Sequence, residues 1–145
     1  MSKIKKVLSK NKTIAMIGVS EDPSKPSTIV MKYMQKYGYK VIPVNPRVKG
    51  EIILGEEVFG KLDEIKTKID IVDVFRPSKE AVEIAKDTVK IKAKALWLQL
   101  GITSKEAKEI VEANNIDYIE NRCTKMEYQK IFLKVTQAFP VLINR

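Results

Sequence analysis

Apolar positions follow two different spacings along this 145-residue chain. Short, nearly continuous apolar runs, typical of strands buried on both faces of a sheet, occupy residues 13–19, 39–44, 70–75, 95–100 and 117–120. Between and around these runs the apolar spacing is helical, which predicts helices over 3–10, 27–37, 79–90, 104–114 and about 126–139. Strands that alternate with helices predict parallel β-α-β units, here within one domain over residues 1–145.

Local signals refine two of these elements and add a third. The helix after the first strand is closed by Gly38, a typical residue just beyond a helix end. Pro43 lies inside the second strand, where an interior strand would lose a ladder donor, so we place it near the end of that strand. Residues 51–54, before Gly55, are predicted to form a short extra strand or a loop.

Five strands joined by right-handed crossovers predict a doubly wound, Rossmann-like α/β fold. We expect a parallel five-stranded sheet in the order 3-2-1-4-5, with helices on both faces. In such sheets, ligands bind outside the carboxyl ends of the strands, at the switch point beside strand one. This rule selects the segments after the five strands, namely residues 18–27, 45–47, 75–78, 99–102 and 121–123.

Composition removes several classes of chemistry. The chain has no histidine, so it lacks the usual near-neutral general base and the commonest zinc ligand. We find no paired carboxylates at the strand ends and expect neither a metal site nor catalysis. The single cysteine suits a reducing compartment, and no apolar run approaches the ~20 residues that span a bilayer. Residues 1–6 lack the apolar core of a signal peptide, so we expect a cytoplasmic protein.

The net charge of +9, from 27 Lys and Arg against 18 Asp and Glu, would attract anions. The lysines are scattered rather than massed, and the chain has no arginine-rich arm and no aromatic-basic interleaving. We therefore interpret the charge first as solubilising. No specific nucleic acid and no membrane are expected as partners.

The loop after the first strand contains one glycine, Gly18, so it is neither a P-loop nor a G-x-G-x-x-G motif. Glycine permits a tight turn there, and the following helix offers free N–H groups and a positive dipole end to an anion. Ser24 or Ser27 is the expected N-cap, and Pro26 suits the first helical turn. Lys25 adds a positive charge. The position at the switch point predicts phosphate binding.

The second and third strand ends carry two arginines. The second strand ends Asn45-Pro46-Arg47, without the carboxylate that holds the ribose hydroxyls of NAD. Arg47 suits a phosphorylated ribose, as in NADP or coenzyme A, although a solvated loop arginine is nearly as good an interpretation. The third strand ends with Phe75 and Arg76, where a ring could cover an adenine and a guanidinium could bind a phosphate. Phe75 equally fits a core position.

The last two strand ends carry less specific signals. Gln99, after the fourth strand, could hydrogen-bond the amides of an extended ligand, whereas Trp97 is interpreted as core. Cys123 follows the fifth strand, and its neighbours Arg122 and Lys125 would favour the thiolate. We favour a buried, space-filling role for Cys123, with proximity to the thiol end of a cofactor as the alternative.

Six segments together resemble a known family. They read I-A-M-I-G-V-S at 14–20, P-S at 26–27, V-I-P-V-N-P at 41–46, D-I-V-D-V-F-R at 70–76, W-L-Q-L-G-I at 97–102 and N-R-C-T-K-M-E-Y at 121–128. In this order and spacing they resemble the stand-alone CoA-binding domain proteins, which are similar to the CoA-binding domain of the succinyl-CoA synthetase alpha subunit. The resemblance implies that coenzyme A lies along the carboxyl ends of the strands, with its pyrophosphate at the first loop.

By position, the resemblance carries over to Gly18, Val19, Ser20, Pro26, Ser27, Asn45, Pro46, Phe75, Arg76, Gln99 and Gly101. Lys25 and Arg47 complete the predicted cofactor-binding set. The chain departs from the family pattern at Val19, usually alanine, at Lys25, frequently arginine, and at Thr124, commonly proline. Lysine is a point charge and binds phosphate without the bidentate fork of arginine.

We therefore expect a small-molecule binding protein for coenzyme A or an acyl-CoA, without catalysis of its own. A phosphohistidine step like that of the synthetase requires a histidine, which the chain lacks. The alternatives are an NADP-binding module or vestigial dehydrogenase and, on net charge alone, a nucleic-acid-associated protein. An unidentified protein partner and the oligomeric state stay open.

Overall fold

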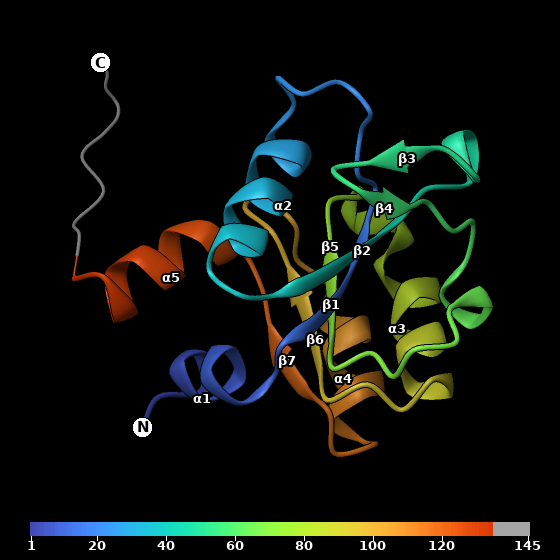
Figure 1. Cartoon of the computed structure of the whole chain (residues 1–145). Coiled ribbons are helices and arrows are strands. Elements are labelled where there is room, and N and C mark those ends of the chain that lie inside the picture. Colours follow the sequence, from blue (N-terminus) through green and yellow to red (C-terminus); the bar gives the residue numbers. More distant parts are fainter. Residues whose placement is uncertain (135–145) are drawn as a thin grey trace.

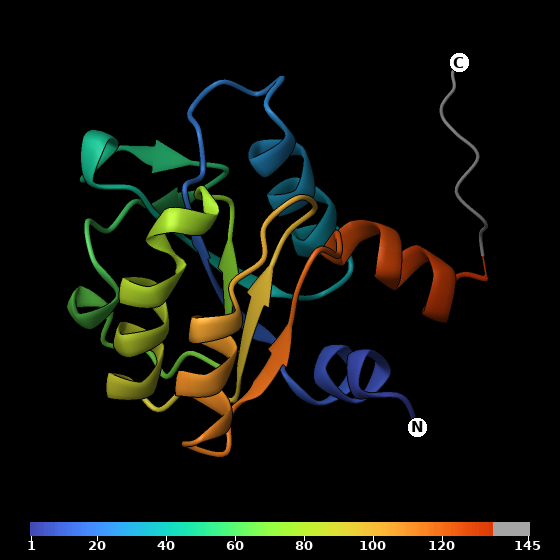
Figure 2. The same cartoon turned by 180° about the vertical axis from the view of Figure 1, so that it is seen from behind.

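Helices cover both faces of a parallel five-stranded sheet in the computed structural model of this chain, which describes residues 1–134 (Figures 1 and 2). The sheet order is β2-β1-β5-β6-β7, and all neighbouring strands are parallel. The strands are β1 (Thr13–Ile17), β2 (Lys40–Val44), β5 (Ile71–Val74), β6 (Ala95–Leu98) and β7 (Asp117–Ile119). The predicted Rossmann-like α/β class is confirmed.

Two apolar clusters fill the space on either side of the sheet, because successive strand residues point to opposite faces. The first cluster includes Met16 and Trp97 and packs against α1 (Lys3–Lys10), α2 (Pro26–Lys36) and α5 (Thr124–Phe132). The second includes Val72 and Leu98 and packs against α3 (Ala81–Lys90) and α4 (Lys105–Glu112). Figure 2 shows α3 and α4 side by side on one face of the sheet.

The position of β5 corrects one detail of the expected order. The run at residues 70–75, counted third from the sequence, lies beside β1 and not beyond β2. The place beyond β2 is taken by a bridge between Val44 and Phe59. If the Phe59 segment is counted as the third strand, β5 becomes the fourth and β6 the fifth. The order is then the predicted 3-2-1-4-5, with β7 as an additional strand beyond β6. A single bridge leaves no apolar run of strand length, so the pattern of the sequence did not reveal it.

The connection from β2 to β5 also contains a short hairpin. Its first strand lies within residues 51–54, where the sequence predicted an extra strand or a loop. The hairpin pairs β3 (Ile52–Ile53) with β4 (Glu56–Glu57) in antiparallel fashion. Pro43 is accommodated because β2 is the last full strand of the sheet. The Lys40 N–H donates toward the β1 side, to the Lys12 carbonyl, so the Pro43 nitrogen three residues later faces outward. The Phe59 N–H donates to the Pro43 carbonyl at 3.0 Å on that outer side.

The start of α2 differs from the expected capping. Lys25 is the N-cap and makes no side-chain cap hydrogen bond, while Pro26 occupies the first turn as predicted. Both candidate serines have other partners, since the Ser24 hydroxyl donates to Asp22 Oδ1 and the Ser27 hydroxyl accepts from the Ser20 N–H. Gly38 follows the helix with φ +94°, which confirms its predicted role.

The last described helix is shorter than the predicted 126–139. Helix α5 begins at Thr124 and ends at Phe132, and Lys134 adopts a left-handed φ of +57° that breaks the helical path. Residues 135–139 of the predicted range fall outside the described residues. Ser104 caps α4 by accepting from the Ala107 N–H. None of the helices between residues 1 and 134 has the length and apolarity to cross a membrane.

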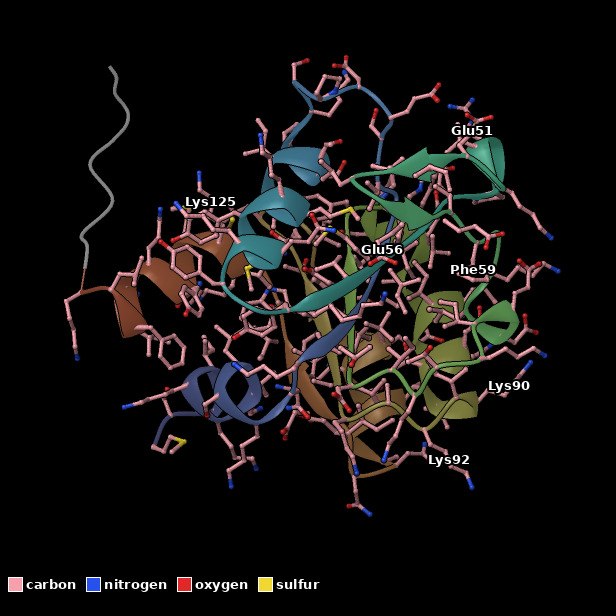
Figure 3. All side chains as sticks on the ribbon, in the orientation of Figure 1. Glu51, Glu56, Phe59, Lys90, Lys92 and Lys125 are labelled. Carbon is pink, nitrogen blue, oxygen red and sulfur yellow. The ribbon has the colours of Figure 1, made fainter. Side chains whose placement is uncertain are left out.

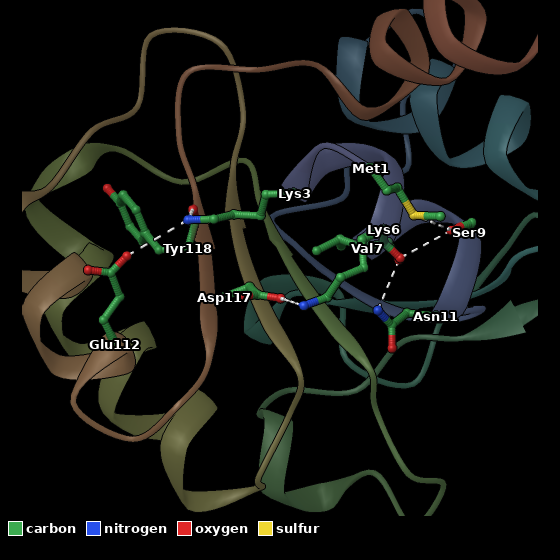
Figure 4. A network of polar contacts seen from close by, with 9 residues as sticks. All are labelled: Met1, Lys3, Lys6, Val7, Ser9, Asn11, Glu112, Asp117 and Tyr118. Atoms are coloured by element: carbon green, nitrogen blue, oxygen red, sulfur yellow. Dashed lines mark hydrogen bonds and ion pairs between the residues drawn. The ribbon is translucent and has the colours of Figure 1, made fainter.

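Helix α1 spans its predicted residues and is fastened to β7 and α4 by polar contacts (Figure 4). The Lys3 ammonium donates to the Tyr118 carbonyl at 3.3 Å and lies 3.9 Å from the Glu112 carboxylate. Lys6 forms an ion pair with Asp117 at 3.8 Å. These contacts hold α1 beside β7, the edge strand of the sheet.

Candidate functional site

The loops after β1, β2 and β5 meet at the switch point around a pocket of about 200 Å³. Its lining consists of Ile17, Gly18, Asn45, Pro46, Arg47, Arg76 and Glu80. Five of these seven belong to the predicted set, and Ile17 and Glu80 do not. Because β5 lies directly beside β1, the end of β5 contributes Arg76 to the same pocket as Gly18.

Gly18 is required at this point of the chain for two independent reasons. Its φ of +94° is a conformation that side-chain-bearing residues rarely adopt. A Cβ at this position would also lie 2.9 Å from the Arg76 Cδ and 3.2 Å from the Phe75 carbonyl oxygen. The Gly18 N–H donates to the Val44 carbonyl at 2.8 Å, which continues the pairing of β1 and β2 into the loop.

Asn45 joins the end of β2 to the first loop. Its Nδ2 donates to the Val19 carbonyl at 2.9 Å, and its Oδ1 accepts from the Arg47 N–H at 3.0 Å. The second contact caps the 3₁₀ turn Pro46–Val48, which carries Arg47 at the pocket. Asn45 therefore positions both its neighbours, and its side-chain amide is already engaged.

The rest of the first loop is held by its own serines and threonine. The Ser20 N–H donates to Ser27 Oγ at 3.1 Å, and the Thr28 hydroxyl donates to the Ser20 carbonyl at 2.6 Å. These two bonds tie the loop to the first turn of α2. Pro26 has no N–H, so the first amides of α2 are those of Ser27 and Thr28. They come before the first intrahelical hydrogen bond, which the Ile29 N–H donates to the Lys25 carbonyl. Unpaired amides at the start of a helix favour the binding of an anion.

Arg76 and Glu80 form a forked ion pair inside the pocket. Arg76 Nε donates to Glu80 Oε1 at 3.1 Å, and Nη2 donates to Oε2 at 2.7 Å. The hydrogen bond to Glu80 raises the pKa of Arg76 further above its usual value, and the one from Arg76 lowers the pKa of Glu80. Both side chains are therefore charged at neutral pH. Arg47 makes no ion pair within the described part of the chain.

The ring of Phe75 is half-buried and packs against the first cluster, in agreement with its core interpretation. Lys25 is exposed at the start of α2 and does not line the pocket. Its coulombic effect is the smallest of those that lower the pKa of Asp22, after hydrogen bonds from Ser24. Ser20, Val19 and Ser27 shape the loop without lining the pocket.

Gln99 does not face the pocket, so its predicted role as a ligand contact is not supported by its geometry. Its side chain is buried, and Nε2 donates to Asp73 Oδ1 at 2.6 Å and to Thr124 Oγ1 at 3.0 Å. Gly101 also lies apart, with φ +82° and an N–H donated to Asn121 Oδ1 at 2.8 Å. Both residues organise the loops that follow β6 and β7.

Sequence reasoning missed the buried carboxylate of Asp73, on the middle of β5. It has no exposed surface, and it accepts from Gln99 and, at 3.2 Å, from the Thr124 hydroxyl. Burial raises the pKa of Asp73 to about 7. The sequence could have indicated this, because Asp73 stands in the middle of the apolar run at 70–75. Burying a carboxyl group there is costly unless it is hydrogen-bonded.

Cys123 is buried in the first cluster between β7 and α5, which confirms the favoured space-filling interpretation. Burial raises the pKa of its thiol and outweighs Lys125, which favours the thiolate as expected. Trp97 is fully buried and donates from Nε1 to the Arg122 carbonyl at 2.8 Å, as expected of a core residue.

Larger hollows lie elsewhere on the molecule. One of about 520 Å³ occupies the opposite, amino edge of the sheet, where Lys92 lies near the bottom of Figure 3. Another, of about 380 Å³, lies between α2 and α5 and includes Tyr33 and Lys125. Neither contains a residue of the predicted set. The smaller pocket is the better candidate because it lies at the switch point and is lined by two arginines.

Comparison with known proteins agrees with this geometry. A family model described as the CoA binding domain matches residues 12–129. The uncharacterized protein YneT of Bacillus subtilis (strain 168) is 35% identical over 127 residues, which covers 88% of this chain and 93% of that protein. The family predicted from the six sequence segments is confirmed.

Solved structures extend the agreement to three dimensions. A Thermus thermophilus protein superposes with a TM-score of 0.86 at 35% identity, over 91% of this chain and all of that one. A region of the dinucleotide-forming acetyl-coenzyme A synthetase 1 of Ca. Korarchaeum cryptofilum, solved with phosphate and ADP, gives a TM-score of 0.62 at 25% identity. That match covers 74% of this chain and 25% of the synthetase.

Proposed function

Because this chain belongs to the CoA binding domain family, we propose that it binds coenzyme A or an acyl-CoA across the carboxyl ends of its strands. The observation that carries the proposal is the pocket at the switch point, where the Gly18 turn, Arg47 and Arg76 come together. A glycine turn, a helix start and two guanidinium groups are a suitable set for a ligand that carries several phosphates.

The proposed placement follows from the local geometry. The pyrophosphate lies between the Gly18 turn and the start of α2, where the Ser27 and Thr28 amides donate. Arg47, at the end of β2, contacts the ribose phosphate, in the position where an NAD site would carry a carboxylate. Arg76 contacts the pyrophosphate from the other side of the turn.

We propose that the bound cofactor undergoes no chemical step on this chain. The support is in the sequence, which has no histidine, and in the single cysteine, whose buried thiol has a raised pKa. The role is then to hold the cofactor for another reaction, with the small molecule as the primary partner. We also propose a cytoplasmic location, because the lone cysteine suits a reducing compartment.

Calorimetric titration of the purified chain with CoA, NADP, NAD and a short DNA duplex tests the proposal. We expect CoA to bind most tightly, with weak binding of both dinucleotides. NADP binding as tight as that of CoA would instead support the NADP-binding alternative, and tight DNA binding with a steep salt dependence would support a nucleic-acid role. Arg47→Ala should weaken CoA binding, whereas Lys92→Ala, at the opposite edge of the sheet, should leave it unchanged.

A further inference from the structure

The candidate pocket contains one negative charge, which is unexpected in a site for a phosphate-bearing ligand. Glu80 lines the pocket together with Gly18, Arg47 and Arg76. Its two carboxylate oxygens meet Arg76 Nε and Nη2 at 3.1 and 2.7 Å. The described pocket therefore presents two guanidinium groups, one of which is already bound by an anion of the chain itself.

The contact has the geometry that a phosphate would use. Guanidinium groups bind carboxylates and phosphates through the same planar fork of two parallel N–H donors. Nε and Nη2 form one edge of that fork, and Glu80 occupies it. Because Arg76 holds the pKa of Glu80 below its usual value, this anion is present throughout the neutral range.

Both partners of the ion pair reach solvent. The Arg76 stem crosses Gly18, with its Cδ 2.9 Å from the point where a Cβ would be, and its side chain is 44% exposed. Glu80 comes from the end of the 3₁₀ turn Ser78–Glu80, and its side chain is 38% exposed. A glutamate at the rim can turn into solvent without disturbing the core, and an exposed ion pair contributes little to stability.

We propose that Glu80 is a built-in competitor for the ligand's phosphate, which occupies Arg76 in the free protein and is displaced when the ligand binds. This inference rests on the proposed function and concerns the regulation of the same site. The contact lowers affinity, because binding must break the Arg76–Glu80 fork and place a phosphate beside a carboxylate. It also favours ligands whose phosphate carries more charge than the carboxylate it replaces.

Glu80→Gln tests the inference, since it keeps the size of the side chain and removes its charge. We expect CoA to bind about two- to fivefold more tightly to this variant. Glu83→Gln is the matched control: Glu83 lies on α3, pairs with Lys86 and is outside the pocket, so its loss should not change the affinity. The gain should disappear when Glu80→Gln is made in an Arg76→Ala background, because the competition is for Arg76.

The outcomes separate this inference from the proposed function. If the unmodified chain binds CoA and Glu80→Gln binds equally or more weakly, Glu80 positions Arg76 rather than competing with the ligand, and the inference is wrong while the function stands. A gain that persists without Arg76 also overturns it. If neither the unmodified chain nor any variant binds CoA, both proposals fail.

Discussion

Gly18 and Arg76 follow different strands, yet a Cβ placed on Gly18 would lie only 2.9 Å from the Arg76 Cδ. The arginine stem thus passes over the glycine where a side chain would stand. The contact arises because β5 pairs directly with β1, so that the ends of these strands are neighbours at the carboxyl edge. The glycine turn and the arginine form one unit of the pocket.

Gly18→Ala should therefore damage both the fold and the site. The positive φ and the close contact each disfavour a methyl group, so we expect a loss of about 1–3 kcal/mol in the free energy of unfolding and weaker CoA binding. Urea denaturation and calorimetry measure the two effects.

Gly38→Ala provides the control for this change. Gly38 has the same φ of +94°, but nothing lies within 4 Å of its added Cβ. The Gly38 variant therefore has the same backbone strain as the Gly18 variant but no steric clash. The loop that contains Gly38 is not part of the pocket. A Gly18 variant that is no less stable than the Gly38 variant, with unchanged CoA affinity, would contradict the role given to the contact.

Arg47→Ala should distinguish the ribose phosphate from the pyrophosphate. If Arg47 meets the 3′-phosphate, the change should weaken CoA about 5- to 100-fold and dephospho-CoA far less. Lys25→Ala should have a smaller effect, since Lys25 does not line the pocket. Calorimetry with both ligands decides the point, and equal losses for CoA and dephospho-CoA would show that Arg47 does not touch that phosphate.

Asp73 should make stability depend on pH. Burial raises its pKa from 3.8 to about 7, so the folded state disfavours the charged form. Protonated Asp73 therefore makes its full contribution to the stability of the fold below pH 3.8. This contribution is lost as the pH rises through 7 and the carboxyl ionises. Asp73→Asn should flatten the profile between pH 4 and 8, with a gain at pH 8 of up to about 4 kcal/mol.

Thr124→Val is a useful companion to that variant. It removes the hydroxyl that donates to the Asp73 carboxylate at 3.2 Å and leaves a side chain of similar shape. The charged form then loses a donor, so the pKa of Asp73 should rise further and stability should continue to fall to a higher pH than in the unmodified chain. Denaturant midpoints across this pH range provide the measurement. Parallel profiles for the chain and both variants would show that Asp73 does not titrate in this range.

The sequence predicted the strands well because each is a continuous apolar run between two helical patterns. It predicted the pocket in large part, since Gly18, Asn45 and Arg47 follow β1 and β2, whose pairing a local pattern can suggest. It misplaced β5 because strand order depends on pairings between distant segments. The bridge at Phe59 that takes the third place is too short to leave a run.

The direction of single side chains was harder to predict. Gln99 was expected to reach a ligand, but an unrecognised buried partner, Asp73, draws its amide into the core. Glu80 was missed although it stands four residues after Arg76, a spacing at which opposite charges meet on a helix. Here the i,i+4 contact forms across a strand end and a 3₁₀ turn, where helix rules do not apply by default.

Cys123 should behave as a core thiol. It lies in the first cluster with 8% of its surface exposed, and burial raises its pKa, so little thiolate is available to a disulfide reagent. We expect the folded protein to react with such a reagent only at the rate at which it opens, and denaturant to increase that rate sharply. Incubation with excess CoA disulfide should leave the intact mass unchanged under native conditions, with Cys123→Ser as the blank. A CoA-sized adduct that forms rapidly on the folded chain, is removed by reductant and is absent from Cys123→Ser would place the thiol within reach of the cofactor instead.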